Sequence, residues 1–400
     1  MDIDHSPVLL TINSGSSSLK FALFSAHGPH PPKRLYRGDI TAIGGDSRFC
    51  VHDNLDVLLQ TRKVTASDHQ QALQQLLAWL PEQTASSALL GIGHRVVHGG
   101  RRFQQPVRIT EDVLTYLHSL SALAPNHQPS CLLGITTLQR LRPQLPQIAC
   151  FDTAFHHHRP AVEQRFALPA GPELDEVQRY GFHGLSYEYI AKTLPDHLGS
   201  DADGRIIVAH LGHGASLCAL HQRRSIATTM TFTPLDGIPM GTRCGSIDPA
   251  VVLYLLQQGM TAERIADLLY FHSGLLGISG ESGDMATLLQ SASMPAQQAV
   301  EQFVHHTVRA IGSLAAALGG VDALIFTAGI GEHAAPIRAA IGDGCKWLGL
   351  HLDDEANRLG RSCISRDDSA VSAWVITTDE EQMIAEHSLH ILNHPHRHQR

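Results

Sequence analysis

The sequence predicts an α/β protein that is divided into two domains. Apolar segments with strand character alternate with segments of helical periodicity along the chain, which favours a mixed architecture over an all-helical or all-β one. The chain has 400 residues, whereas one hydrophobic core usually organises no more than roughly 250–300. Two segments with one plan, residues 8–24 and 206–220, indicate a duplicated domain.

Both of these segments have the pattern of a β-hairpin with a turn of glycine and small polar residues. VLLTINSGSSSLKFALF and IIVAHLGHGASLCAL each begin with an apolar strand and continue into a second strand that starts with Ser-Leu. Glycines and hydroxyl groups in such a turn leave backbone N–H groups open to an anion. Because Gly-Ser turns also join ordinary hairpins, the two turns indicate phosphate-binding loops only in combination with other motifs.

Helix signals follow in order between the strands. Three residues are placed as N-caps ahead of apolar segments with helical spacing: Asp68, Thr110 and Asp248. Asp248 is followed by proline at the first helical position, where its missing N–H costs nothing. The longest predicted helix runs from about residue 295 to residue 318, and Gly319 ends it.

Composition excludes several classes of protein. The formal net charge is −8 and the charges are scattered, so no basic face is offered to nucleic acid or to an anionic membrane. No apolar run is long enough for a membrane span. Seven cysteines without a C-x-x-C spacing, together with an N-terminus that has no export signal, predict a cytoplasmic protein with reduced thiols.

The 27 histidines raise the hypothesis of a transition-metal site. His156, His157 and His158 are consecutive, and a second run, HPHRH, lies near the C-terminus. Transition-metal sites need several ligands that are held convergently, which a solvated tail does not provide. Surface imidazoles are therefore the preferred interpretation.

A series of longer motifs resembles the acetate kinase family, within the larger group that includes sugar kinases and actin. They occur in family order as TINSGSSSLKF (11–21), GHRVVHGG (93–100), FDTAFH (151–156), RYGFHGLSYEYI (179–190), AHLGHGAS (209–216), TPLDGIPMGTRCGSIDP (233–249), SGLLGISGESGD (273–284), FTAGIGEH (326–333) and TTDEEQMIA (377–385). The resemblance covers nearly the whole chain, from about Val8 to about His390.

The resemblance implies two RNase-H-like (actin-like ATPase) domains, each with a mixed central sheet flanked by helices. The expected domains are residues 1–155, joined by a C-terminal helix at about 380–395, and residues 156–379. It also implies an active site in the interdomain cleft and a homodimer. The implied reaction is reversible transfer of the γ-phosphoryl group of ATP to acetate or a similar short-chain acid, giving ADP and an acyl phosphate, with Mg²⁺ or Mn²⁺.

Phosphoryl transfer depends on positioning and on positive charge around the transferred oxygens. Arg95 and Arg243 match the family positions that hold the carboxylate and the phosphoryl group, and a guanidinium fork suits both anions. His183 matches the histidine that donates to the phosphoryl group in flight. Asp152 matches the catalytic aspartate, which orients an arginine and the acceptor and need not be a strong base. The structural alternatives are a surface ion pair, a satisfied core histidine and a helix cap.

The remaining candidate residues come from the same resemblance. Further contacts to the acid are expected from Val97, Asn126, Phe182 and Pro234. Contacts to the nucleotide are expected from Ser16, Ser18, Lys20, His210, Leu211, Gly212, His213, Gly214, Asp284, Met285, Ala286, Gly329, Ile330, Gly331, Glu332 and His333. Asn13 and Glu380 match the metal-linked positions, since Mg²⁺ needs only one or two oxygen ligands from the protein. Glu381 is assigned instead to a capping box that begins at Thr378.

Four positions depart from the family pattern. His213 and His333 stand where asparagine is expected, Ala286 where arginine is expected, and Asn126 where leucine is expected. They leave open a kinase for propionate or another short-chain or hydroxylated acid, and a nucleotide-binding regulator that no longer catalyses. Retention of the catalytic set favours an enzyme. A sugar kinase is a further alternative, but two arginines suit a carboxylate better than a neutral hydroxyl.

Overall fold

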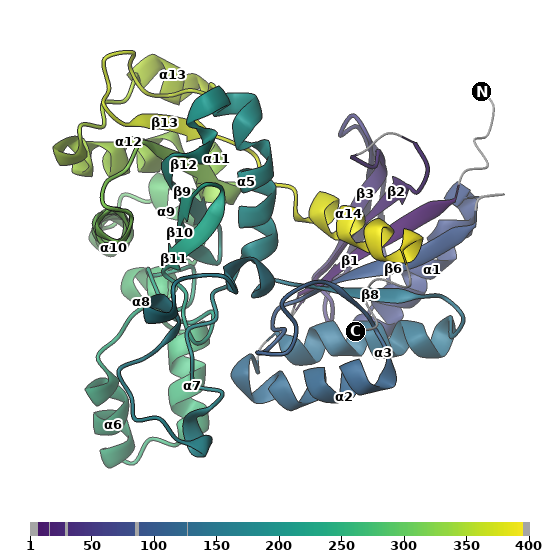
Figure 1. Cartoon of the computed structure of the whole chain (residues 1–400). Coiled ribbons are helices and arrows are strands. Elements are labelled where there is room, and N and C mark those ends of the chain that lie inside the picture. Colours follow the sequence, from purple (N-terminus) through teal and green to yellow (C-terminus); the bar gives the residue numbers. More distant parts are fainter. Residues whose placement is uncertain (1–6, 16, 29–30, 85–87, 126, 395–400) are drawn as a thin grey trace. The chain divides into compact units, whose positions relative to one another are not determined.

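The structure is a computed structural model that describes residues 7–15, 17–28, 31–84, 88–125 and 127–394 (Figure 1). The chain divides into two compact units, which are described separately. Unit 1 comprises Met1–Ala154 with Asp379–Arg400, and unit 2 comprises Phe155–Thr378. The domain boundaries expected from the sequence lie one residue from these divisions. The predicted α/β class, with two mixed sheets flanked by helices, is confirmed, and the assignment of both units as RNase-H-like domains stays a prediction.

Unit 1 is built on a mixed sheet with the strand order β5-β4-β3-β2-β1-β6-β8-β7. The strands are β1 (Val8–Ser14), β2 (Leu19–Ser25), β3 (Arg34–Thr41), β4 (Arg48–Asp53), β5 (Leu58–Lys63), β6 (Leu89–Val96), β7 (Val107–Arg108) and β8 (Gln147–Phe151). β1, β6 and β8 are parallel neighbours, while β1 to β5 form an antiparallel series. The carboxyl ends of β1, β6 and β8 therefore meet at one edge of the sheet.

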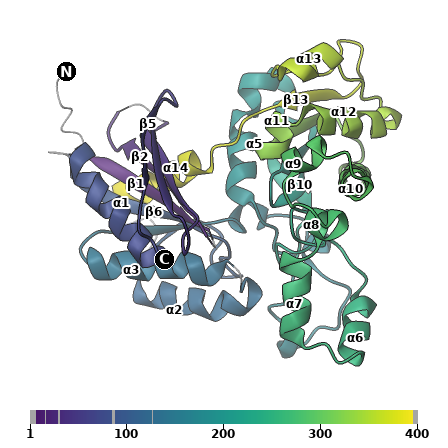
Figure 2. The ribbon, with the colours of Figure 1, turned by 180° about the vertical axis from the view of Figure 1, so that it is seen from behind.

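Helices cover both faces of this sheet (Figures 1 and 2). They are α1 (His69–Thr84), α2 (Glu111–Ser119), α3 (Gln128–Leu141) and α14 (Glu380–Asn393). Side chains alternate along each strand, so Leu10 and Ile12 join the core beneath α1, while Leu9 packs with Ala385 and Leu389 of α14. Unit 1 thus takes its last helix from the far end of the chain.

Unit 2 contains a five-stranded mixed sheet in the order β11-β10-β9-β12-β13. Its strands are β9 (Arg205–Leu211), β10 (Ala215–His221), β11 (Arg224–Thr228), β12 (Ala323–Thr327) and β13 (Ser372–Val375). β11, β10 and β9 are antiparallel, and β9, β12 and β13 are parallel. The series β3-β2-β1-β6-β8 of unit 1 has the same order and directions. The duplication indicated by the two hairpin motifs therefore extends over five strands.

The helices of unit 2 lie on both sides of its sheet, with α5 and α10 on opposite faces (Figures 1 and 2). They are α4 (Ala161–Gln164), α5 (Gly184–Leu198), α6 (Pro249–Gln257), α7 (Ala262–Phe271), α8 (Gly274–Ser279), α9 (Met285–Gln290), α10 (Met294–Leu318), α11 (Ala328–His333), α12 (Ala335–Gly344) and α13 (Asp354–Leu359). In the described part of the chain, no helix is long and apolar enough to cross a membrane.

The N-caps placed from the sequence are confirmed. Asp68, Thr110 and Asp248 each accept a hydrogen bond from a backbone N–H of the first turn that follows, at 2.8, 3.3 and 2.8 Å. The long helix is also confirmed: α10 begins after Ser293, whose side chain caps it, and Gly319 ends it with φ 71°. That left-handed conformation favours glycine because it carries no Cβ.

The predicted capping box at the start of α14 is wrong. The N-cap is Asp379, whose carboxylate accepts from the Gln382 N–H at 2.9 Å. Thr378 is engaged within unit 2, where its hydroxyl pairs with Ser186 at 2.8 Å and its N–H donates to Glu332. Glu381 therefore does not have the capping role that was predicted for it. Burial and the charges of Glu380 and Asp379 raise the pKa of its carboxyl group.

Candidate functional site

In unit 1, predicted site residues gather where β1, β6 and β8 end. Asn13 is the penultimate residue of β1, Arg95 the penultimate residue of β6, and Asp152 directly follows β8. Glu380 joins them because α14 packs across β6. A Cβ atom on Gly93 would lie 2.3 Å from Ser388 Oγ, so only glycine lets the helix approach this closely. Long-range pairing thus assembles groups that are far apart in the sequence.

Arg95 is bound by Asp152 in a bidentate ion pair. Its Nε donates to Asp152 Oδ1 at 3.0 Å, and its Nη2 donates to Oδ2 at 2.6 Å. A third donor, Nη1, reaches Asn13 Oδ1 at 3.2 Å. Burial raises the pKa of Asp152, and the adjacent guanidinium opposes that rise. The pair fixes the plane of the Arg95 guanidinium, as expected for a planar fork on a carboxylate.

Further charged groups surround this pair. Glu380 Oε2 lies 3.8 Å from Arg95 Nε. Lys20 stands between Asn13 and Asp39 in the strand register, so the three side chains share one face of the sheet. Burial raises the pKa of Asp39, and the charge of Lys20 opposes the change. With Asp152 and Glu381, these described residues place four carboxyl groups around the two cations Arg95 and Lys20.

The β1–β2 turn is held by a bond within the turn and by a contact from the first residue of α1. The Gly15 N–H donates to the Ser18 carbonyl at 2.8 Å, and His69 Nε2 lies 2.7 Å from the Gly15 carbonyl oxygen. Ser18 is part-buried and Lys20 exposed. Ser16 lies outside the described residues. β1 and β2 are therefore paired as the hairpin that the sequence predicts.

In unit 2, the loop that ends at His183 packs on the buried side chain of His156. His156 is fully buried, with Nδ1 2.8 Å from Ser225 Oγ and Nε2 2.8 Å from the Phe182 carbonyl oxygen. Burial, with the charge of Arg159, lowers the pKa of His156 to about 3. Gly181 has φ 86°, and a Cβ there would lie 2.5 Å from the His156 ring. His156 is thus a neutral core histidine that supports the loop, so the interpretation as a surface imidazole is wrong for this residue.

His183 and Arg243 both face Gly214. A Cβ atom on Gly214 would lie 2.9 Å from Arg243 Nη2 and 3.5 Å from His183 Nε2. Arg243 Nη1 donates to the Pro234 carbonyl at 2.7 Å, which fixes the guanidinium. His183 has φ 57°, an uncommon left-handed conformation for a residue with a side chain, and it immediately precedes α5. The two donors predicted to contact the phosphoryl group are thus neighbours in unit 2.

The β9–β10 turn supplies the next candidates. The His210 ring stacks on the His183 ring with centroids 4.3 Å apart, and its Nδ1 lies 2.8 Å from Ser186 Oγ. Leu211 is buried in the core, and the Gly212 N–H closes the turn on the Gly214 carbonyl. His213 packs against Gly241, where a Cβ would lie 2.3 Å from its ring. Burial and the charge of Arg243 lower the pKa of His213.

The residues predicted to contact adenosine have structural contacts of their own. Asp284 caps α9 by accepting from the Thr287 N–H and hydroxyl, and the hydroxyl bond is the largest cause of its lowered pKa. Met285 is buried and Ala286 exposed. Glu332 accepts from the Ala328 N–H at 2.8 Å, so its carboxylate holds the start of its own helix. The other members of this set, Gly329, Ile330, Gly331 and His333, also lie in α11.

The predicted lining of the acid pocket is apolar where it is described. Val97 is buried in unit 1, and Phe182 and Pro234 are buried in unit 2. Asn126 lies outside the described residues.

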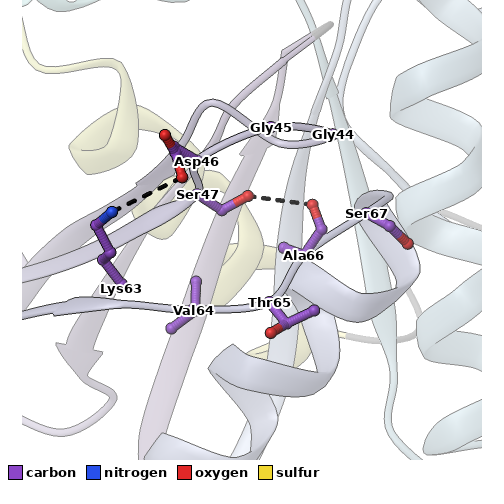
Figure 3. A pocket seen from close by; sticks show the side chains of 9 residues that line it. All are labelled: Gly44, Gly45, Asp46, Ser47, Lys63, Val64, Thr65, Ala66 and Ser67. Atoms are coloured by element: carbon purple, nitrogen blue, oxygen red, sulfur yellow. Dashed lines mark hydrogen bonds and ion pairs between the residues drawn. The ribbon is translucent and has the colours of Figure 1, made fainter.

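Each unit has a cavity in its described part. One of about 420 Å³ lies in unit 1 and contains none of the predicted residues; Lys63 and Asp46 flank it as an exposed ion pair (Figure 3). Another of about 450 Å³ lies in unit 2 beside α5, and Glu332 and His333 contribute to its wall. In the described part of the chain, no group of three or more histidine, cysteine or acidic side chains is placed to hold a metal.

Several supporting residues were missed in the sequence. Arg338 is 1% exposed and donates to the carbonyls of Gly331 and Glu332, the last turn of α11. Tyr187 and Ser216 are fully buried beside His183. Ser216 and Tyr187 occur within recognised motifs, but spacing alone could not reveal which residue supports which.

The comparisons with known proteins agree and cover most of both units. The sequence profile of the acetokinase family matches residues 8–386. This chain belongs to the acetokinase family. Family membership makes it a kinase, an enzyme that uses ATP to transfer a phosphoryl group.

Individual members of the family support the assignment. An acetate kinase of Rhodopseudomonas palustris is 52% identical over 96% of this chain and 98% of its own length. A solved propionate kinase of Francisella tularensis is 35% identical, with a TM-score of 0.88 over 95% of this chain and 98% of its own. The solved acetate kinase of Porphyromonas gingivalis is 32% identical, with a TM-score of 0.83 over 97% of this chain and 100% of its own.

Proposed function

We propose that this member of the acetokinase family catalyses the reversible transfer of the γ-phosphoryl group of ATP to acetate, giving acetyl phosphate and ADP. The observation that carries the proposal is the pairing of Arg243 Nη2 and His183 Nε2 about Gly214. Two donors that converge on a glycine backbone suit an anion that must approach closely.

Arg95 binds the carboxylate of the acid in this proposal. Its Nε and Nη2 donate to Asp152, while the second hydrogens of Nη1 and Nη2 are available for an incoming carboxylate. Asp152 acts by holding the guanidinium, because acetate is already deprotonated at neutral pH. Further contacts to the acid are proposed for Val97, Asn126, Phe182 and Pro234.

ATP is proposed to bind through both hairpin turns and α11. The proposed contacts in the first turn are Ser16, Ser18 and Lys20. Those in the second turn are His210, Leu211, Gly212, His213 and Gly214. Asp284, Met285, Ala286, Gly329, Ile330, Gly331, Glu332 and His333 form the adenosine site. Asp284 and Glu332 contribute by shaping α9 and α11, since their carboxylates are engaged there.

We propose Mg²⁺ as the metal that accompanies ATP, with Mn²⁺ as its substitute. Asn13 Oδ1 and the Glu380 carboxylate are hard oxygen donors that both lie against Arg95. The surplus of carboxyl groups over cations in this described cluster also suits a divalent ion. The metal would neutralise phosphate charge, and Mg²⁺ bound to a nucleotide needs few protein ligands.

A single assay tests the reaction. The purified chain is incubated with ATP, Mg²⁺ and each of acetate, propionate, butyrate and glycolate, and acyl phosphate is trapped with hydroxylamine. Acetate is expected to give hydroxamate in proportion to ADP. Tight ATP binding without any hydroxamate would favour a non-catalytic regulator, and ATP consumption only with a sugar would favour a sugar kinase.

Propionate is the second candidate acid, since a structural relative is named as a propionate kinase. Asn126 also introduces a polar group where the family pattern has leucine, so we propose a more polar pocket. Leucine covers an added CH₂ with a gain of about 0.8 kcal/mol, which a carboxamide does not provide. Comparing kcat/KM for acetate, propionate and glycolate between the parent and Asn126→Leu tests this. The proposal of a more polar pocket fails if Asn126→Leu leaves all three values and their ratios unchanged.

A homodimer is proposed from the surface of α6. No residue of this helix is buried in the single chain, and its large apolar side chains are exposed: Leu253 by 59% and Tyr254 by 58%. Such an apolar surface is typical of an interface. Light scattering should give twice the chain mass, and Leu253→Glu with Tyr254→Glu should reduce it. A concentration-independent monomer would contradict the proposal.

We further propose a cytoplasmic location, where ATP is available. The seven cysteines are all described and all are free thiols, four of them buried. Reduced thiols of this kind fit a reducing compartment. Fractionation of cells should recover the chain with cytoplasmic markers, and recovery with an exported fraction would refute the assignment.

A further inference from the structure

Tyr187, Ser216 and His183 form a hydrogen-bonded chain within unit 2. The Tyr187 hydroxyl lies 2.5 Å from Ser216 Oγ, and Ser216 Oγ lies 2.8 Å from His183 Nδ1. Tyr187 and Ser216 are both fully buried. The chain runs from α5 through β10 to the ring whose other nitrogen, Nε2, faces Gly214.

The protons in this chain can be placed by counting donors and acceptors. Within the described residues, Ser216 Oγ is the partner recorded for the Tyr187 hydroxyl, so the tyrosine proton points to the serine. Burial raises the pKa of Tyr187, so this proton is retained. Ser216 has one proton of its own, which it then donates to His183 Nδ1. A ring nitrogen that accepts a hydrogen bond carries no proton.

We propose that Tyr187 and Ser216 are positioning residues that hold His183 as the neutral tautomer protonated on Nε2. This inference rests on the proposed function, because it assigns the hydrogen that His183 offers to the phosphoryl group. The opposite tautomer would place a lone pair toward Gly214, where it would repel phosphate oxygens. The tautomer is set by the hydrogen bond on the other ring nitrogen.

The same chain opposes a second proton on the ring. A protonated His183 would donate from Nδ1 to Ser216, Ser216 would turn to Tyr187, and the tyrosine proton would lose its described acceptor. A buried donor without an acceptor is unfavourable. The groups that face the ring act in the same direction: Arg243 is a cation beside Gly214, and His210 is stacked on the ring. Like charges disfavour protonation.

Tyr187→Phe tests the proposal, because it removes one oxygen and the proton that directs Ser216. Histidine ring ¹⁵N spectra are recorded against pH, and the His183 signals are identified by their loss in His183→Gln. The parent should show a protonated Nε2 and an unprotonated Nδ1. Tyr187→Phe should show a mixture of both tautomers, with a titration midpoint higher by about one pH unit. Ser216→Ala provides a second route to the same mixture.

Kinetics give an independent readout. His183 is proposed to act on the phosphoryl group in flight, so Tyr187→Phe should lower kcat several-fold while KM for ATP and acetate change less than about twofold. Tyr189→Phe removes a hydroxyl from the same helix and serves as the matched control, with unchanged kcat and unchanged His183 signals.

Two results would overturn the inference. One is a parent His183 protonated on Nδ1. The other is a Tyr187→Phe variant that loses thermal stability while tautomer and titration midpoint stay as in the parent, which would show a purely structural role. The spectra do not depend on turnover. Failure to phosphorylate acetate would therefore refute the proposed function and leave the tautomer assignment to be judged separately.

Discussion

At the scale of single residues, Arg243 carries the clearest prediction. Its guanidinium is fixed by the Pro234 carbonyl and faces Gly214 beside His183. Because a preorganised charge matters most in the transition state, Arg243→Ala should lower kcat by roughly 10²–10³. Steady-state kinetics with acetate check this. Arg223→Ala, which breaks an exposed ion pair with Asp203, is the control and should leave kcat unchanged. A raised KM with normal kcat would instead indicate ground-state binding.

Two adjacent residues at the start of α14 are expected to have different roles: Glu380 in binding the metal and Asp379 in capping the helix. Glu380→Gln should raise the Mg²⁺ concentration needed for half-maximal activity, because it removes a charged oxygen donor. Asp379→Ala removes the cap on Gln382 and the 2.6 Å ion pair with Arg34, so it should cost about 0.5–2 kcal/mol of stability. Metal titration and urea unfolding of both variants check the assignment. Exchanged phenotypes would show that the two roles are reversed.

His94 predicts how stability depends on pH. It is buried with Nε2 2.7 Å from Gln147 Oε1, and burial lowers its pKa to about 4, although the hydrogen bond acts in the opposite direction. The unfolded chain takes up this proton near pH 6.5 and the folded chain does not. Stability should therefore be lost as pH falls from 6.5 toward 4, by roughly 3 kcal/mol in full.

Urea midpoints between pH 7.5 and 4.5 measure this effect. His94→Gln keeps a donor for Gln147 but cannot titrate, so its midpoint should fall less steeply with pH than that of the parent. Equal slopes would mean that His94 is protonated to the same extent in the folded and unfolded chains.

At the scale of elements, the contact of α14 with β6 depends on a glycine. Ser388 and Ile384 of α14 fill the space that a side chain on Gly93 would occupy. Their nearest atoms would lie 2.3 and 2.6 Å from an added Cβ. Gly93→Ala should cost about 1–3 kcal/mol, since a packed interior cannot absorb the methyl group without shifting. Gly171→Ala is the control, because nothing lies near that Cβ. Equal denaturation midpoints for both variants would contradict the packing argument.

Local signals predicted elements well because each involves neighbours in sequence. Asp68, Thr110 and Asp248 cap the helices that follow them, as short-range hydrogen bonding requires. The start of α14 was mispredicted because Thr378 is bound by Ser186 and Glu332, which lie far away in the chain. Local propensity cannot anticipate such a competitor.

At the scale of the whole molecule, the motifs predicted the duplicated sheet and the residues of the candidate site. They did not predict which buried residues hold those site residues in place. Strand order explains why Arg95 reaches Asp152, since β6 and β8 are parallel neighbours. The residues behind the site, Tyr187, Ser216, His156 and Arg338, act through burial and hydrogen bonds. Their partners are fixed only once the sheets and helices are packed.

The return of the chain to unit 1 has a consequence for synthesis on the ribosome. Leu9 and Phe24 need Ala385 and Leu389 to cover them, yet all of unit 2 is translated in between. At 5–20 residues per second, the first strands wait roughly 20–70 seconds for their last helix. A chain stopped after residue 378 should therefore aggregate on expression, whereas one stopped after residue 394 should not. Sedimentation of both products checks this, and a dispersed, cooperatively folded 378-residue chain would show that nascent unit 1 needs no such partner.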